Sequence, residues 1–382
     1  MKILTISNLY PRPDRPQAGM FNAQLLREMV EGDAVAALQQ ITLVPEWRVW
    51  RWAGIRKWVS PYTGGHGVEY WPVLYVPGVG RNWSAGTYAR SLKGLASRVA
   101  AADVVFASWL YPDGVVAATL AQAAGKPAWL MVLGSDVQHL QAPARRKQIL
   151  EACRVAAGIV CVGRHLATAL IEAGVDSHRV HVVPNGVDAV QFCFRPREVA
   201  RTQLAAHGFP AGVTRMVLFV GNLVSVKAPE RFLCAMADLA DPTVHAGLIG
   251  TGPMQAGLVR LARRRGVGDR VHFLGRQDHA HVALWMNAAD VLCLCSRREG
   301  MPNVILEALA SGLPVAATDV GACRDMLGDE AAARLAAEGD AAALARALRE
   351  LLTMPVDRAK MAARHGRRSW SDQARDILQL MR

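Results

Sequence analysis

Short apolar runs alternate with helical patterns along the chain, and this alternation predicts the fold. Each run has four to seven residues, and amphipathic segments with a 3.6-residue period lie between the runs. Strands that alternate with helices in this way are typical of parallel sheets in α/β domains. The pattern occurs twice, in residues 3–7, 104–107, 127–133, 158–162 and 180–183, and again in residues 216–220, 246–249, 271–274, 291–295 and 314–317. We therefore expect two doubly wound parallel-sheet domains.

A polar stretch at residues 192–211, which contains Pro196 and Pro210, separates the two sets of strands. We place the linker at its start, with an N-terminal domain at residues 1–190 and a C-terminal domain at residues 191–367. The length of 382 residues supports this division, since a single core holds about 100 to 150 residues. The last segment, residues 368–382, has apolar residues at helical spacing and is predicted to dock as an amphipathic helix. The alanine-rich segment 331–352 is predicted to be one helix.

The chain is basic, with 44 Lys and Arg against 32 Asp and Glu and a formal charge of +12. This charge favours an anionic partner, which could be a phosphate-bearing substrate, an anionic lipid or a nucleic acid. No nucleic-acid-binding module accompanies the charge, so we expect no nucleic acid partner. The seven cysteines form no CxxC pair and are interpreted as buried thiols, so neither a disulfide framework nor a zinc site is expected.

The ends and apolar runs of the chain bear on its location. The N-terminal sequence MKILTISNLYP has an apolar run too short for the core of a signal peptide, which favours the cytoplasm. No stretch reaches 18 uncharged apolar residues, so no membrane-spanning helix is expected.

Residues 295–315, CSRREGMPNVILEALASGLPV, carry the strongest chemical signal. An apolar strand is followed by a Gly loop and by Pro302, which suits the first turn of a helix. The amides of residues 301–303 are therefore predicted to face an anion at a helix N-terminus. Glu299 precedes this helix and Glu307 lies about a turn inside it. Because a carboxylate accepts hydrogen bonds from two sugar hydroxyls at once, the two acids are predicted to contact different parts of one ligand.

This segment resembles the donor-binding motif of retaining glycosyltransferase family 4, in which seven residues separate two Glu and the first Glu begins Glu-Gly-x-Pro-Asn. Other segments along the chain also resemble the family, in the same order as in its members. They are residues 10–21, 111–114, 134–136, 184–188, 250–253, 271–275, 289–291, 312–315 and 318–321. The arrangement is similar to the subgroup found in bacterial surface-polysaccharide and teichuronic-acid-type clusters. The resemblance implies the GT-B fold, in which two Rossmann-like domains face each other across a cleft and the C-terminal helix crosses back onto the first.

The resemblance also assigns roles to individual residues. It places Glu307 on the nucleotide ribose and Glu299 on the transferred sugar. Lys227 matches the family's diphosphate lysine, which makes Lys227 and Glu299 the expected catalytic pair. Gly19 matches a glycine whose amide approaches the phosphates. The backbone around sugar and diphosphate would come from Gly300, Met301, Pro302 and Asn303.

Two positions depart from the family pattern. Asn222 stands where the family usually has Arg, and it can donate a hydrogen bond but carries no charge. Leu133 stands where many members have His, and it can neither donate nor accept a proton. The second change bears on the acceptor side, to which the resemblance assigns Tyr111, Asp113, Ser135 and Asp136.

Residues 47–58, WRVWRWAGIRKW, are not explained by the family resemblance. They contain four Trp, four basic residues and no acid, a composition suited to a bilayer interface with anionic headgroups. Two alternatives stay open at this point. The tryptophans could pack against the N-terminal domain, or they could line an acceptor groove.

The sequence therefore predicts a retaining glycosyltransferase of surface polysaccharide biosynthesis. It would move a sugar from a nucleoside-diphosphate sugar, UDP ahead of GDP, to a hydroxyl of a glycan or lipid-linked acceptor. We expect no metal or other cofactor. We expect peripheral contact with the inner face of the plasma membrane. The alternatives are a GT-B sugar isomerase or phosphorylase, and a non-catalytic nucleotide-binding scaffold, which Asn222 and Leu133 favour.

Overall fold

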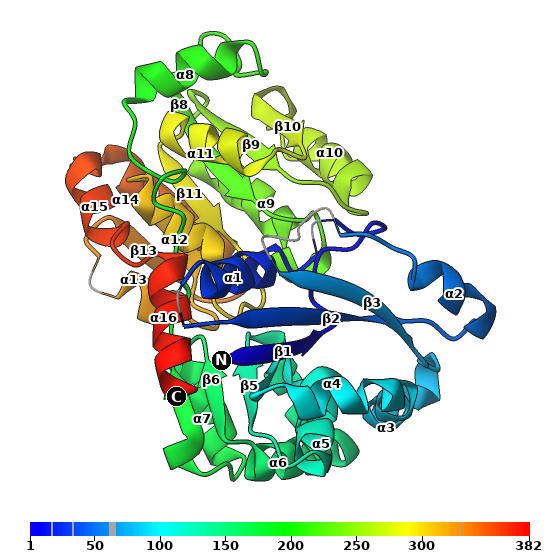
Figure 1. Cartoon of the computed structure of the whole chain (residues 1–382). Coiled ribbons are helices and arrows are strands. Elements are labelled where there is room, and N and C mark those ends of the chain that lie inside the picture. The colour runs from blue at the N-terminus through cyan, green and yellow to red at the C-terminus, as the bar shows by residue number, and fades with distance from the viewer. Residues whose placement is uncertain (17, 33, 61–65, 329) are drawn as a thin grey trace. The chain divides into compact units, whose positions relative to one another are not determined.

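The computed structural model describes residues 1–16, 18–32, 34–60, 66–328 and 330–382. Its contacts divide the chain into unit 1, Met1–Asn185 with Trp370–Arg382, and unit 2, Gly186–Ser369 (Figure 1). The division thus falls between Asn185 and Gly186 rather than between residues 190 and 191. Phe192, at the start of the expected linker, is only 2% exposed and belongs to the core of unit 2. Its burial explains why this stretch belongs to unit 2.

In its described part, unit 1 holds a seven-stranded parallel sheet with the strand order β3-β2-β1-β4-β5-β6-β7. The strands are β1 (Lys2–Ser7), β2 (Ala37–Pro45), β3 (Gly67–Val73), β4 (Val104–Ser108), β5 (Ala128–Val132), β6 (Gly158–Cys161) and β7 (Val180–Val182). The helices are α1 (Met20–Glu31), α2 (Trp52–Ile55), α3 (Ser84–Ser91), α4 (Ala96–Ala101), α5 (Val115–Ala123), α6 (Pro143–Val155), α7 (Arg164–Glu172) and α16 (Trp370–Leu380).

Burial explains which strands of unit 1 the apolar pattern predicted. All residues of β4 and β5 are buried, as expected for continuous apolar runs in the middle of a parallel sheet. β2 and β3 were not predicted. In β2, Gln39 and Gln40 interrupt the apolar pattern, and Gln39 donates a hydrogen bond to Glu69 of β3 at 2.8 Å. β3 contains Pro72, which the sheet accommodates because β3 is an edge strand.

The C-terminal helix α16 packs within unit 1. It buries Trp370, Ile377 and Leu378, as the helical spacing predicted, and lies against α1 (Figure 1). Its Gln373 Nε2 donates a buried hydrogen bond of 2.9 Å to Asn185 Oδ1, at the end of the first part of the unit.

In its described part, unit 2 holds a six-stranded parallel sheet with the strand order β10-β9-β8-β11-β12-β13. The strands are β8 (Arg215–Val220), β9 (Val244–Ile249), β10 (Val271–Gly275), β11 (Val291–Leu294), β12 (Val315–Thr318) and β13 (Ala333–Ala336). The helices are α8 (Arg197–Ala205), α9 (Pro229–Leu239), α10 (Gln255–Arg264), α11 (His279–Ala288), α12 (Asn303–Ala310), α13 (Cys323–Leu327), α14 (Ala341–Thr353) and α15 (Arg358–His365). The prediction of two Rossmann-like domains is confirmed.

One prediction in unit 2 was wrong. The segment 331–352 is not one helix, because it divides into strand β13 and helix α14. Gly339 has φ +91°, a left-handed conformation that interrupts a helix. The Asp340 side chain then caps α14 by accepting a hydrogen bond of 2.7 Å from the Ala343 amide.

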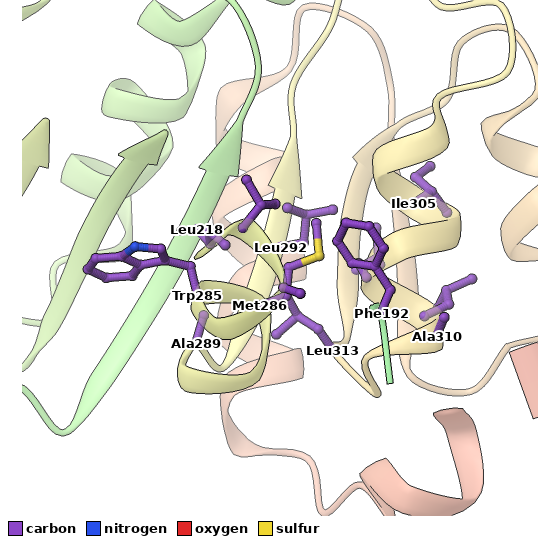
Figure 2. Close-up of a cluster of buried hydrophobic side chains, with 14 of the residues drawn as sticks. Phe192, Leu218, Trp285, Met286, Ala289, Leu292, Ile305, Ala310 and Leu313 are labelled. Carbon is purple, nitrogen blue, oxygen red and sulfur yellow. The ribbon is translucent and has the colours of Figure 1, made fainter. Parts of the chain in front are cut away.

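The core of unit 2 holds α12 in place. Figure 2 shows Ile305 and Ala310 of α12 in a buried cluster that also contains Phe192, Leu292 and Leu313. This apolar face fixes the helix that carries Glu307. Within the described ranges, no helix combines the length and apolar character needed to cross a bilayer.

Candidate active site

Two loops of unit 2 bring the predicted donor residues together. They follow β8 and β11, which are neighbours in the sheet although they are far apart in the sequence. The strand order reverses between these two strands, and ligands of open α/β sheets bind at the carboxyl ends of the strands at such a point. The loop after β8 carries Asn222 and Lys227, and the loop after β11 carries Glu299.

Lys227 and Glu299 form an ion pair. Lys227 Nζ lies 2.7 Å from Glu299 Oε1 and 2.9 Å from Oε2. The Ser296 hydroxyl donates a second hydrogen bond to Glu299 Oε1 at 2.6 Å. The Glu299 side chain is 8% exposed and that of Lys227 is 29% exposed. The carboxylate is therefore fixed inside the site, and the ammonium group remains accessible to a ligand.

Backbone hydrogen bonds hold the two loops against each other. The Arg297 amide donates to the Val226 carbonyl at 2.9 Å, and the Cys295 thiol donates to the Ala228 carbonyl at 3.2 Å. Thr318, at the end of β12, donates its hydroxyl to the Ser296 carbonyl at 2.7 Å. The loops are thus tied to each other and to the next strand.

Gly321 packs closely against the backbone of Glu299. Its φ is +58°, and a Cβ at this position would lie 2.1 Å from the Glu299 carbonyl oxygen. The amide of the next residue, Ala322, donates to the Gly300 carbonyl at 2.9 Å. Only glycine allows this close approach, so the segment 319–322 positions the backbone of Glu299 and Gly300.

Helix α12 begins directly after this loop. Gly300 and Met301 lead into it, Asn303 is its first residue, and Pro302 is the N-cap rather than part of the first turn. The first N–H groups of a helix have no intrahelical acceptor and carry the positive end of the helix dipole. The amides of the first helical turn therefore begin at Asn303, two residues after Met301, where they were predicted to begin.

Glu307 lies in the second turn of α12 and is partly exposed. Burial of its carboxyl group raises its pKa to about 7. Within the described ranges, no side chain or amide donates a hydrogen bond to this carboxyl group. A desolvated carboxyl group without an internal donor is suited to accept hydrogen bonds from the hydroxyl groups of a ligand.

Asn222 is exposed in the loop after β8, and its side chain makes no hydrogen bond within the described ranges. Arg297, another cation of the site, donates to Glu230 of α9 at 2.7 Å and to the Ser225 carbonyl at 3.1 Å. Arg297 is thus already engaged, whereas the Asn222 amide can donate to a ligand.

Gly19 lies in unit 1, at the start of α1. Its φ is +66°, and a Cβ would lie 2.2 Å from the Leu9 carbonyl oxygen. That carbonyl also accepts a hydrogen bond of 2.6 Å from the Asn22 side chain. Gly19 therefore allows the chain that follows β1 to fold tightly against the N-terminus of α1.

Asp113 and Asp136, two of the four acceptor-side residues, are fully buried in unit 1. Burial raises the pKa of Asp113 to about 8, and its Oδ2 accepts a hydrogen bond of 2.6 Å from the Asn8 amide. Its Oδ1 is buried without a partner in the described part of the chain. Burial raises the pKa of Asp136 to about 6, although the amides of Gly134 and Leu133 donate to it at 2.7 and 3.2 Å.

Tyr111 and Ser135 complete this group. The Tyr111 ring is buried, and its hydroxyl donates to the Arg81 carbonyl at 3.1 Å. Ser135 is exposed, in the turn that follows β5. Among the four acceptor-side residues, three therefore hold loops in place from inside unit 1 and one faces outward.

Sequence reasoning missed Ser296 and Thr318 as parts of the site. Both are buried polar residues at the ends of apolar strands. A hydroxyl at the end of a buried strand, three residues before Glu299, was the available signal. In the described ranges, no group of three His, Cys, Asp or Glu is arranged to hold a metal ion.

Comparison with known families matches both units. Residues 205–369 match the model described as glycosyl transferases group 1, and residues 47–191 match the model described as Glycosyltransferase Family 4. Both models describe glycosyltransferases, which agrees with the resemblance carried by the segment 295–315.

Similar curated proteins differ in the acceptor that their names give. The chain is 32% identical over 229 residues to the 2-deoxystreptamine glucosyltransferase of Streptomyces kanamyceticus, covering 58% of each chain. It is 35% identical over 225 residues to a D-inositol 3-phosphate glycosyltransferase of Frankia alni, covering 54% of each chain. The matched region thus spans little more than half the length of these relatives.

Solved structures of similar fold extend over nearly the whole chain. The structure of HepE from Anabaena, in complex with UDP, superposes with a TM-score of 0.78 over 99% of each chain at 19% identity. This similarity supports the fold of the two units.

Proposed function

We propose that this chain transfers a sugar from a nucleoside-diphosphate sugar to a hydroxyl of a glycan or lipid-linked acceptor, with retention of configuration. The observation that carries the proposal is the cluster at the carboxyl ends of β8 and β11. It combines an accessible ammonium group on Lys227, a fixed carboxylate on Glu299, a helix N-terminus at Asn303 and the unpaired carboxyl group of Glu307.

Each group of the cluster has a chemical task in this proposal. The departing diphosphate develops negative charge, and preorganised donors that stabilise such charge are often the largest contribution to catalysis. Lys227, the Asn222 amide and the first turn of α12 would supply those donors. Glu307 would accept hydrogen bonds from the ribose hydroxyls, and Glu299 would accept hydrogen bonds from hydroxyls of the transferred sugar.

Retention in this scheme needs no covalent enzyme intermediate. Glu299 is held by Lys227 and Ser296, so it orients the sugar, while the acceptor hydroxyl attacks on the face from which the diphosphate leaves. The new glycosidic bond forms as the bond to the diphosphate breaks, and the hydroxyl proton passes to the leaving group or to water. Because protein donors would stabilise the diphosphate, we propose no metal or other cofactor.

The exposed segment 47–59, here called the tryptophan arm, supports a lipid-linked acceptor and peripheral membrane contact. Trp50 is 71% exposed and Trp47 is 54% exposed, and the two rings pack edge to face with their centroids 6.0 Å apart. Val49 and Val59 are exposed beside them. Large apolar side chains left in solvent beside basic residues are typical of surfaces that meet anionic lipid.

Other tryptophans of the arm anchor it to unit 1. Trp52 Nε1 donates to the Glu46 carbonyl at 3.4 Å, and the Trp58 ring packs on Tyr70 at 5.6 Å. Packing against the domain therefore accounts for Trp52 and Trp58, but it does not account for Trp47 and Trp50. On this basis we propose a role in surface polysaccharide synthesis at the inner face of the membrane.

A thermal-shift screen against UDP, GDP, ADP and their sugars tests the proposal. A ligand at about 100 times its dissociation constant adds about 2.7 kcal/mol of stability. UDP is the first nucleotide to test because the HepE structure contains it. We expect one nucleotide and its sugars to raise the melting temperature, with no new sugar product formed without an acceptor. No shift with any nucleotide would overturn the donor site, and product formed without acceptor would indicate an isomerase.

A further inference from the structure

A cluster of two arginines and a histidine in unit 1 has no role in the proposed donor site. Arg81 comes from the turn Gly78–Asn82, His139 from the turn Ser135–Gln141, and Arg145 from the first turn of α6. These turns follow β3 and β5. In the parallel sheet of unit 1, both strands end at the same edge, where ligands of open α/β sheets bind.

His139 contacts Arg145 directly, and Tyr111 connects it to the Arg81 backbone, whose carbonyl accepts from the Tyr111 hydroxyl at 3.1 Å. An Arg145 guanidinium nitrogen is hydrogen-bonded to His139 Nδ1, and the His139 ring lies 5.4 Å from the ring of Tyr111. Burial, Arg145 and Arg81 together lower the pKa of His139 to about 4. Since guanidinium only donates, Nδ1 is the acceptor and the imidazole proton lies on Nε2. His139 is therefore a neutral hydrogen-bond donor beside the Arg145 guanidinium group.

No carboxylate in the described part of the chain pairs with Arg81 or Arg145. Other arginines of unit 1 do have acidic partners, such as Arg48 with Glu46 and Arg154 with Glu151. Arg145 Nε is buried without a hydrogen-bond acceptor among the described residues. The cluster thus carries positive charge that the protein itself does not neutralise.

Helix stability does not account for Arg145. It is the third residue of α6, which has no side-chain cap and no acidic residue in its first turn. A positive charge at a helix N-terminus opposes the helix dipole and weakens the helix. An anion bound at Arg145 would relieve this unfavourable interaction.

We propose that Arg81, His139 and Arg145 bind the phosphate group of a phosphorylated acceptor. The guanidinium group matches the geometry of phosphate oxygens with paired N–H donors, and His139 Nε2 adds a neutral donor. Exposed Ser135 lies in the same turn as His139. The inference rests on the proposed function, because it names the class of acceptor that this transferase uses. A soluble sugar phosphate and a lipid phosphate share this chemistry.

Calorimetric titration tests the site directly, with UDP held at a saturating concentration. Glucose 6-phosphate is expected to bind, and glucose at least tenfold more weakly. Arg145→Gln and Arg81→Gln are each expected to lower the affinity for glucose 6-phosphate by tenfold or more. Arg146→Gln is the matched control, because Arg146 lies on the same helix and donates to the Ala173 carbonyl. Circular dichroism melting checks that each variant folds. If Arg145→Gln does not fold, Arg81→Gln alone tests the site.

Vesicles distinguish the two sources of phosphate. The protein is sedimented with vesicles that contain phosphatidic acid and with vesicles that contain phosphatidylserine. Stronger binding to phosphatidic acid that is lost in Arg145→Gln would assign the site to a lipid phosphate. Binding of glucose 6-phosphate without that dependence would assign it to a soluble one. Equal affinity for glucose and glucose 6-phosphate, or no change in both Arg variants, would overturn the site. Titrations with UDP alone report on the donor site separately, so failure of the proposed function is distinguishable from failure of this inference.

Discussion

Lys227 Nζ lies within 2.9 Å of both carboxylate oxygens of Glu299, although the two residues are 72 positions apart in the sequence. This ion pair joins the loop after β8 to the loop after β11. A partly buried pair of this kind makes each partner dependent on the other, because removal of one leaves the other charge uncompensated. Binding of a diphosphate offers Lys227 a second anionic partner without displacing it from the site.

The two acids of the donor motif are expected to separate in binding measurements. Glu307→Ala should weaken UDP binding by about tenfold or more, since hydrogen bonds to a charged group contribute about 1.5 to 3 kcal/mol. Glu299→Ala should leave UDP affinity unchanged or raise it, because Lys227 then has only the diphosphate as partner, and it should lower transfer. Calorimetric titration with UDP measures the UDP affinity of both variants, and a transfer assay measures turnover. Glu350→Ala, at an exposed position, is the control. Equal losses in both variants would contradict the division of roles.

The buried acids of unit 1 predict a pH dependence of stability. Because the folded pKa of Asp113 is raised to about 8, the folded state holds this proton more tightly than the unfolded state does. Stability should therefore fall as the pH rises from about 4 to about 8. Asp113→Asn should reduce this loss, since the amide stays neutral and can still accept from the Asn8 amide.

Asp136→Asn is the matched comparison for Asp113→Asn. Both Asp136 oxygens accept backbone N–H groups, so an amide nitrogen would face a donor, and the variant should be less stable than wild type at all pH values. Melting temperatures between pH 5 and pH 8 measure both effects. An unchanged pH slope in Asp113→Asn would refute the assignment to that residue.

The fold was predictable where burial and sequence pattern coincide. Strands such as β4 and β5 are buried on both faces and consist of continuous apolar runs. β13 was missed because its alanines favour a helix, and only Gly339 and the Asp340 cap separate it from α14. Polar residues satisfied by a neighbouring strand, such as Gln39, leave no such pattern.

The donor residues could be named from their spacing, but their contacts could not. Spacing along one segment identified Glu299 and Glu307, because both lie within a few residues of one helix start. The pairing of Lys227 with Glu299 depends on the sheet order, which the sequence pattern does not report. The burial of Asp113 and Asp136 was likewise not predicted, since acids in Gly-rich turns are usually exposed.

The tryptophan arm is expected to bind anionic vesicles. Each basic residue near an anionic surface contributes about 1 kcal/mol, so replacing Arg51, Arg56 and Lys57 with Gln should weaken binding about a hundredfold. Trp50→Ala should weaken it further. The matched control replaces the same number of exposed arginines at the C-terminal end of α10, namely Arg263, Arg264 and the C-cap residue Arg265. Vesicle flotation that is equal in the arm variant and in the control would assign the arm to another role.

Asn222→Arg is expected to be tolerated and to raise the affinity for the donor. The side chain at this position is exposed and makes no hydrogen bond within the described ranges, so a longer cation displaces no internal contact. It would restore the Arg and Lys pair that the family usually has. Donor affinity from calorimetry measures the change, and a loss of more than about threefold would place the diphosphate elsewhere.

The turnover of Lys227→Met at saturating donor tests the central claim most directly. Removal of one preorganised donor to a developing negative charge costs about 3 to 4 kcal/mol in the transition state. The variant should therefore turn over about a hundredfold more slowly or worse, whereas the control Lys360→Met, on α15 of the same unit, should match wild type. A Lys227→Met enzyme with turnover within about threefold of wild type would contradict the proposal that Lys227 stabilises the departing diphosphate.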